Sequence, residues 1–184
     1  MPLHVVLTVL MAIDVVFIAA TAVMGLGLTD QASMMQHYVA GMLTSMLTCF
    51  IHVLVLFYLI GTGKDIREAV EDDPDLKERY WPWTQRQKRR AFPPACFAIV
   101  LMIVATLMGG EVHSRLLVVD GGATLPFRGI TAWWVHGAFV VAAVLVSAWA
   151  FVVELAGARE NRRGIQEINA ELERREREGN SRTP

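Results

Sequence analysis

Three histidines lie near the same ends of different apolar segments, where their imidazoles could bind one shared cofactor. His37 opens one apolar run, His113 directly follows another, and His136 lies about one helical turn into a third. Imidazole is a common axial ligand of b-type haem, and a nearby glycine lets the porphyrin approach the helix backbone. The sequence therefore indicates four candidate haem-binding residues, which are His37, Gly41, His113 and His136.

A metal ion is the alternative ligand of this histidine layer. Three imidazoles and one carboxylate offer the nitrogen and oxygen ligands that Zn and Cu accept. The candidate metal ligands are His37, Glu111, His113 and His136. A further alternative has no cofactor, because histidines at the headgroup level of a membrane also make ordinary local hydrogen bonds.

Two other ionisable residues, Asp14 and His52, lie in the middle of apolar runs. The run Val5–Leu26 contains no charge besides Asp14, and His52 lies within Tyr38–Ile60. A rise of about 1.5 Å per residue, counted from the same end of each helix, places the two at matching depth. An imidazolium beside a carboxylate lowers the cost of burying both groups. We therefore predict a buried Asp14–His52 pair, which either holds or passes a proton or serves as a structural hydrogen bond between helices.

Four apolar segments must position these residues, and each is long enough to cross a membrane. They span about 5–27, 36–62, 92–110 and 131–156, and one helical crossing needs roughly 20 apolar residues. Hydrophobic residues make up 54% of the 184 residues, charged residues 19%, and the mean hydropathy is +0.40. These values favour an all-α integral membrane protein, a bundle of four transmembrane helices formed by residues 1–158.

Each predicted span carries one stripe of small and polar residues at helical spacing. This pattern is expected when every helix turns one face toward a shared interior and its apolar residues toward lipid. We expect Glu154, near the end of the last span, to pair with Arg159 or to reach the headgroups. In chain order the stripes are Asp14, Thr21 and Gly25; His37, Gly41, Thr44, Thr48 and His52; Ala95, Met102, Thr106, Gly109 and His113; and His136, Ala143, Ser147, Ala150 and Glu154.

The distribution of basic residues predicts the orientation of the bundle. Of the 17 lysines and arginines, 15 lie either between the second and third spans or after the fourth, and only Arg115 and Arg128 lie elsewhere. Cytoplasmic segments carry the excess of basic residues. With four spans, both termini and the middle segment are then cytoplasmic, and we predict a multi-pass protein of the inner (plasma) membrane.

The segments outside the spans have three different characters. The middle segment, residues 63–90, mixes charges with Tyr80, Trp81 and Trp83, which predicts an element at the membrane surface. Residues 159–184 are expected to form a charged cytoplasmic helical tail with a disordered end. Residues 116–127 surround the turn sequence Asp120-Gly121-Gly122. Their β-prone runs predict a small extracytoplasmic hairpin flap between the third and fourth helices.

The leading functional hypothesis is a membrane b-type haem protein that transfers electrons, or a membrane anchor subunit of a redox complex. Two histidines on facing helices resemble the architecture of four-helix membrane b-type cytochromes, such as the anchors of respiratory oxidoreductases. The resemblance implies haem b, a quinone and a redox partner subunit. The alternatives are a non-catalytic structural membrane subunit, or an outer metal site with an Asp14–His52 proton path. The chain shows no nucleophile elbow or phosphate loop, and its basic segments between spans are poor evidence for nucleic acid.

Overall fold

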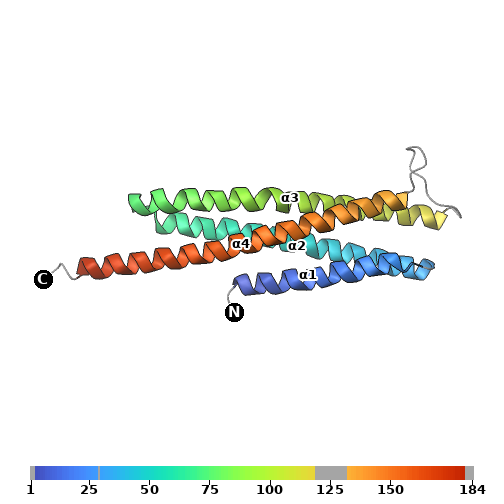
Figure 1. Cartoon of the computed structure of the whole chain (residues 1–184), viewed down its shortest axis with the longest axis horizontal. Coiled ribbons are helices and arrows are strands. Elements are labelled where there is room, and N and C mark those ends of the chain that lie inside the picture. Colours follow the sequence, from blue (N-terminus) through green and yellow to red (C-terminus); the bar gives the residue numbers. More distant parts are fainter. Residues whose placement is uncertain (1–2, 29, 119–131, 181–184) are drawn as a thin grey trace.

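The computed structural model describes residues 3–28, 30–118 and 132–180, and these residues form four long helices (Figure 1). The helices are α1 (Leu3–Leu26), α2 (Gln31–Ala69), α3 (Pro74–Val118) and α4 (Ala132–Asn180). Each helix is long and apolar enough to cross a membrane. The prediction of an all-α bundle with four spans is therefore confirmed.

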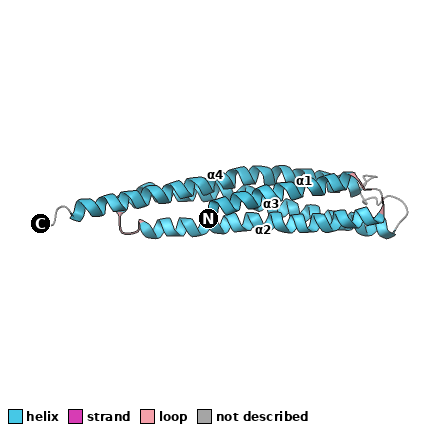
Figure 2. Cartoon of the chain, turned by 90° about the horizontal axis from the view of Figure 1, so that it is seen from below, coloured by secondary structure: helices cyan, strands magenta, loops and turns pink. Residues whose placement is uncertain are grey.

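The helices run side by side along one long axis (Figure 2). The N-terminal start of α1, the turn between α2 and α3, and the C-terminal end of α4 point toward the same end of the bundle (Figure 1). We call this the terminal end, and we call the opposite end, where α1 connects to α2, the loop end. The shared direction of both termini agrees with an even number of crossings. The side of the membrane that each end faces stays a prediction.

Three helices are longer than their predicted spans. Residues 63–90 complete α2 and begin α3, which continues through Pro82, Pro93 and Pro94. Their predicted position at the membrane surface stays a prediction. The chain after residue 159 likewise continues α4 without a break as far as Asn180. The parts of α2, α3 and α4 that pass the start of α1 at the terminal end are called the three-helix extension (Figure 1).

Apolar packing explains why the three-helix extension is ordered. Its buried residues come from all three helices and form one cluster, on which the partly buried Trp83, Ile165 and Leu172 pack. Ile165, Ile168 and Leu172 recur at helical spacing in the sequence, and they all face this cluster. The buried members of the cluster are Ile66, Val70, Leu76, Tyr80 and Ile168.

Aspartates cap two of the helices. The Asp30 carboxylate accepts a hydrogen bond of 2.7 Å from the Ser33 amide at the start of α2, and this amide holds the pKa of Asp30 below its usual range. Asp73 accepts from the amides of Asp75 and Leu76 at the start of α3. Asp73 also pairs with Arg175 of α4. This ion pair fixes the turn between α2 and α3 against the end of α4.

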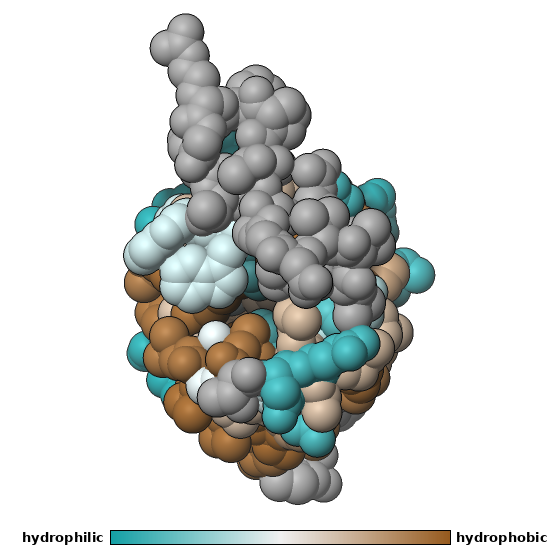
Figure 3. Space-filling view, turned by 90° about the vertical axis from the view of Figure 1, so that its right-hand side faces the viewer, coloured by the Kyte–Doolittle hydropathy of each residue, from teal (hydrophilic) through white to brown (hydrophobic). Residues whose placement is uncertain are grey.

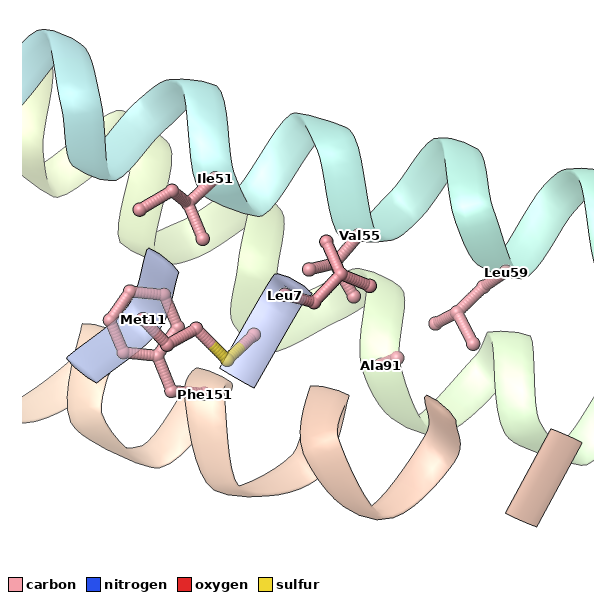
Figure 4. Packing of buried hydrophobic residues seen from close by; sticks show 7 residues of the cluster. All are labelled: Leu7, Met11, Ile51, Val55, Leu59, Ala91 and Phe151. Carbon is pink, nitrogen blue, oxygen red and sulfur yellow. The ribbon is translucent and has the colours of Figure 1, made fainter. Parts of the chain in front are cut away.

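Inside the spans, small residues let the helices approach closely. Ala95 and Ala98 of α3 and Ala143 and Ala150 of α4 have no exposed surface. A second group of buried residues brings all four helices together (Figure 4), comprising Leu7, Met11, Ile51, Val55, Leu59, Ala91 and Phe151. The large apolar residues that point outward are those expected to face lipid, such as Val16, Phe57, Leu107 and Leu145.

The view onto the loop end shows hydrophobic residues spread over the flank of the bundle (Figure 3). The prediction of a hairpin flap concerned residues 116–127. Residues 116–118 are the last residues of α3, so the first predicted β-prone run is largely helical. The rest of the predicted flap, residues 119–127, lies outside the described residues.

Candidate functional site

His37 of α2 lies in a notch on α1. Its Nδ1 atom is 3.1 Å from the backbone oxygen of Thr21. Four residues further along α1, Gly25 leaves the space that the imidazole fills, since a Cβ atom there would lie 2.8 Å from Cε1 of His37. The ring is therefore held by a hydrogen bond and by the absence of a side chain on the neighbouring helix.

His136 of α4 repeats this arrangement on α3. Its Nδ1 atom is 3.0 Å from the backbone oxygen of Ala105. Gly109, again four residues further along, would place a Cβ atom 2.9 Å from Cε1 of His136. The two histidines are thus seated in the same way on two different helices, although no sequence repeat relates the helix pairs.

The hydrogen bonds fix the tautomer of both imidazoles. A backbone carbonyl oxygen only accepts hydrogen bonds, so Nδ1 must carry the proton in each ring. In the neutral imidazole the lone pair then belongs to Nε2. A histidine that donates through Nδ1 and offers Nε2 is the form that binds a metal centre with its orientation set by the hydrogen bond.

Both imidazoles lie near the starts of their helices, toward the loop end. His37 and His136 are both half-buried and lie within electrostatic range of each other. Gly41, expected beside His37 for access of a porphyrin, faces α1 instead, where its Cβ position is 3.7 Å from a methyl carbon of Thr21. The same Thr21 shares a hydroxyl hydrogen bond of 2.9 Å with Thr44 of α2. Gly41 thus belongs to the α1–α2 contact that supports His37.

His113 is placed differently from the other two histidines of this layer. Its ring stacks on Tyr38, with the ring centroids 4.8 Å apart and the planes 9° from parallel. Its Nδ1 atom is buried and has no hydrogen-bond partner among the described residues. Unlike Nδ1 of His37 and of His136, Nδ1 of His113 therefore bonds no backbone carbonyl among the described residues.

The metal alternative receives no support from the geometry. His37, Glu111, His113 and His136 all lie among the described residues. Within that part of the chain, no three side chains of histidine, cysteine, aspartate or glutamate come close enough together to hold a metal ion. The four predicted ligands therefore do not converge on one point.

Deeper in the bundle, His52 of α2 contacts Glu154 of α4. The Nδ1 atom of His52 lies 2.9 and 3.1 Å from the two carboxylate oxygens, and neither side chain has any exposed surface. Phe151 stacks on the imidazole with a centroid distance of 4.6 Å. As in the other two rings, Nδ1 is the donor. Its Nε2 atom is buried without a hydrogen-bond partner in the described part of the chain.

Asp14 is held by Thr48 and does not bond His52. The Thr48 hydroxyl lies 3.0 and 2.9 Å from the two Asp14 oxygens, and both residues are fully buried. The predicted direct Asp14–His52 hydrogen bond is therefore not formed, because Glu154 occupies Nδ1 of His52 and Nε2 has no partner. Thr48 and His52 are one helical turn apart on α2, so the two contacts are adjacent.

Sequence reasoning missed three residues that this geometry makes important. Glu154 was expected near Arg159 or the headgroups, yet it is the partner of His52. Gly25 and Gly109 were recognised only as small members of their stripes, yet they create the two histidine notches. One signal was present: Glu154 lies on the same stripe of its helix as His136.

No known protein family, curated protein or solved structure matches this chain.

Proposed function

We propose that this chain is an integral membrane b-type haem protein that transfers electrons, in which His37 and His136 would hold the haem. One observation carries the proposal. Two histidines from α2 and α4, within electrostatic range of each other, both donate through Nδ1 to a carbonyl of a neighbouring helix and keep the Nε2 lone pair. When bound, the haem supplies one-electron chemistry.

The chain's own residues would set the position and properties of such a centre. Thr21 and Ala105 provide the accepting carbonyls, which orient the two rings and increase their basicity. Gly25 and Gly109 admit the rings to the helix surface. The surrounding apolar helices would exclude water from the iron. Four apolar spans would place the centre in the plasma membrane, where a quinone and a redox partner subunit are the proposed electron donor and acceptor.

A structural membrane subunit is the second candidate, and the same two contacts favour it. Each histidine ties one helix to its neighbour, His37 joining α2 to α1 and His136 joining α4 to α3. Hydrogen bonds of this kind between membrane helices contribute about 0.6 kcal/mol on average. In this alternative the histidines specify helix packing and the protein is colourless.

Replacement by asparagine separates the two candidates. An asparagine amide can donate near the position of Nδ1, so His37→Asn and His136→Asn keep the donor and remove the Nε2 ligand. For a haem protein, each variant should stay folded in detergent but lose the low-spin spectrum. His113→Asn is the matched control and should keep it. Low-spin spectra in both ligand variants would refute this pair of ligands.

A further inference from the structure

Three ionisable groups from three helices lie in a second layer, displaced toward the terminal end. Along α2, His52 is separated from His37 by about 22 Å, at roughly 1.5 Å per residue. Asp14, His52 and Glu154 have no exposed surface, and none of them takes part in the proposed haem site. We call these three residues the inner triad.

Two buried polar atoms at this level are without hydrogen-bond partners in the described structure. One is Nε2 of His52, and the other is the hydroxyl oxygen of Ser147 on α4. Ser147 is one turn from Phe151, which stacks on His52. A buried polar atom without a partner is costly unless water or an exchangeable ligand satisfies it. The acids of the triad are therefore accompanied by a buried basic atom that has no hydrogen-bond partner in the described structure.

The charges of the inner triad require bound protons. With both carboxylates ionised and the imidazole neutral, the triad would carry two negative charges inside an apolar bundle, which is a costly state. Neutrality is reached only when two protons are bound among the three residues. Either both acids are protonated, or one acid and the imidazolium are. When Asp14 is the protonated acid and His52 is the imidazolium, both ring nitrogens carry protons and the Glu154 carboxylate accepts from Nδ1.

We propose that Asp14, His52 and Glu154 form a proton-binding site within the membrane. On uptake, a proton bonds to the Nε2 lone pair of neutral His52, and the imidazolium is balanced by the Glu154 carboxylate at Nδ1. On release, the same N–H bond breaks and the proton passes to water. Asp14 is the second acid of the site, and the Thr48 hydroxyl holds both of its oxygens.

The surroundings contain few other groups that could titrate. On α2, Cys49 lies within electrostatic range of Asp14. On α3, the buried residues at this level are Ala95 and Ala98. On α4, the neighbours of Glu154 along its buried face are Phe151 and Ser147. The protonation state is thus controlled mainly by the triad itself.

A line of polar contacts connects the inner triad to the histidine layer. The Thr48 hydroxyl oxygen, which lies within hydrogen-bond distance of Asp14, is also 2.9 Å from the backbone oxygen of Thr44. The hydroxyl groups of Thr44 and Thr21 share a hydrogen bond of 2.9 Å. The Thr21 carbonyl in turn accepts from Nδ1 of His37. A row of polar contacts between α1 and α2 therefore leads from Asp14 of the proton-binding site to His37.

Infrared difference spectroscopy of the full chain in lipid nanodiscs tests this proposal without any cofactor. Spectra are compared between about pH 5 and pH 8, the range in which histidine side chains act as proton switches. The spectrum of each variant is subtracted from that of the wild type, so that the contributions of the other histidines and carboxylates cancel. We expect the His52→Gln subtraction to leave an imidazole band that changes with pH, and the Glu154→Gln subtraction, in which an acceptor for Nδ1 is kept, to leave a carboxyl band.

Two controls make the test specific. Asp30→Asn alters an exposed cap outside the spans, and Ser45→Ala removes a hydroxyl that bonds Thr106 away from the triad. Both should keep the bands that change with pH. Asp14→Asn provides a second triad variant if Glu154→Gln does not fold. A wild-type spectrum without a change of either kind, or bands that are identical in the wild type and in every triad variant, would overturn the proton-binding site and leave the haem proposal untouched.

Discussion

His52 and Glu154, 102 positions apart in the chain, join α2 to α4 through a hydrogen bond of 2.9 Å between Nδ1 and Oε1. Neither side chain reaches the surface. In an apolar bundle without a strong hydrophobic force between helices, such a polar contact specifies which helix faces meet. The same contact leaves Nε2 of His52 as the unpaired atom of the inner triad.

Breaking the His52–Glu154 contact should destabilise the bundle. Glu154→Ala leaves the buried Nδ1 donor of His52 unsatisfied, at a cost of about 1–3 kcal/mol. Thermal unfolding in detergent should show a lower Tm. Ser147→Ala is the matched control on the same helix, since its buried hydroxyl has no partner in the described structure and its loss should leave the Tm unchanged or raised. A smaller effect from Glu154→Ala than from Ser147→Ala would contradict the pairing.

A Gly→Ala substitution should lower the Tm at a glycine whose space is filled by a histidine, and it should keep or raise the Tm at a glycine in open space. In a helix, Gly→Ala alone favours folding by about 1 kcal/mol, whereas overpacking a filled site costs about 1–3 kcal/mol. Gly25→Ala and Gly109→Ala force Cβ against His37 and His136, so both should lower the Tm and displace the imidazole.

Gly137→Ala serves as the control for those two variants. No atom lies within 4 Å of its Cβ position. It should keep or raise the Tm, measured in the same thermal unfolding series. Equal effects at Gly109 and Gly137 would mean that His136 does not occupy the notch.

A third notch holds the three-helix extension together. A Cβ atom on Gly164 of α4 would lie 2.5 Å from the Trp83 ring of α3, and indole is too rigid to move aside cheaply. Gly164→Ala should therefore loosen the extension and accelerate proteolysis near the turn between α2 and α3. Gly61→Ala, in open space on α2, should leave the rate of cleavage unchanged. Equal cleavage of the two variants would show that this contact does not order the extension.

The orientation of the bundle is open to a direct measurement. Because 15 of the 17 basic residues flank the terminal end, reporter fusions in the turn between α2 and α3 and at the C-terminus should score cytoplasmic. A fusion in the connection between α3 and α4 should score external. If a C-terminal reporter were external, the terminal end would face outward, and the loop end with His37 and His136 would face the cytoplasm.

The four spans could be predicted from the sequence because length and hydropathy are properties of each segment alone. The helical tail after residue 159 was also predicted, whereas the early start of α3 at Pro74 was not, because it depends on contacts between segments. Ile66, Leu76 and Ile168 bury one another from three helices, and only this mutual packing makes a charged stretch helical. The helix also continues through the prolines at positions 82, 93 and 94.

In the site, too, the properties of a single helix could be predicted from the sequence, whereas the contacts between helices could not. Helical spacing placed His37, His52 and His136 on interior faces, and depth placed Asp14 level with His52. Spacing cannot say which neighbour each face meets. Rotation of the helices brought Glu154 to His52 and left Asp14 with Thr48. The role of Gly25 and Gly109 was hidden for the same reason, since a glycine acts through the side chain that fills its space.

The absorption spectrum of the purified wild-type protein in detergent tests the haem proposal most directly. The protein, isolated as expressed and again after titration with haemin, should show a Soret band and, once reduced, the sharp α and β bands of low-spin haem b. These bands should require both His37 and His136. A protein that stays folded, colourless and unchanged by haemin would contradict the proposal and favour the structural subunit.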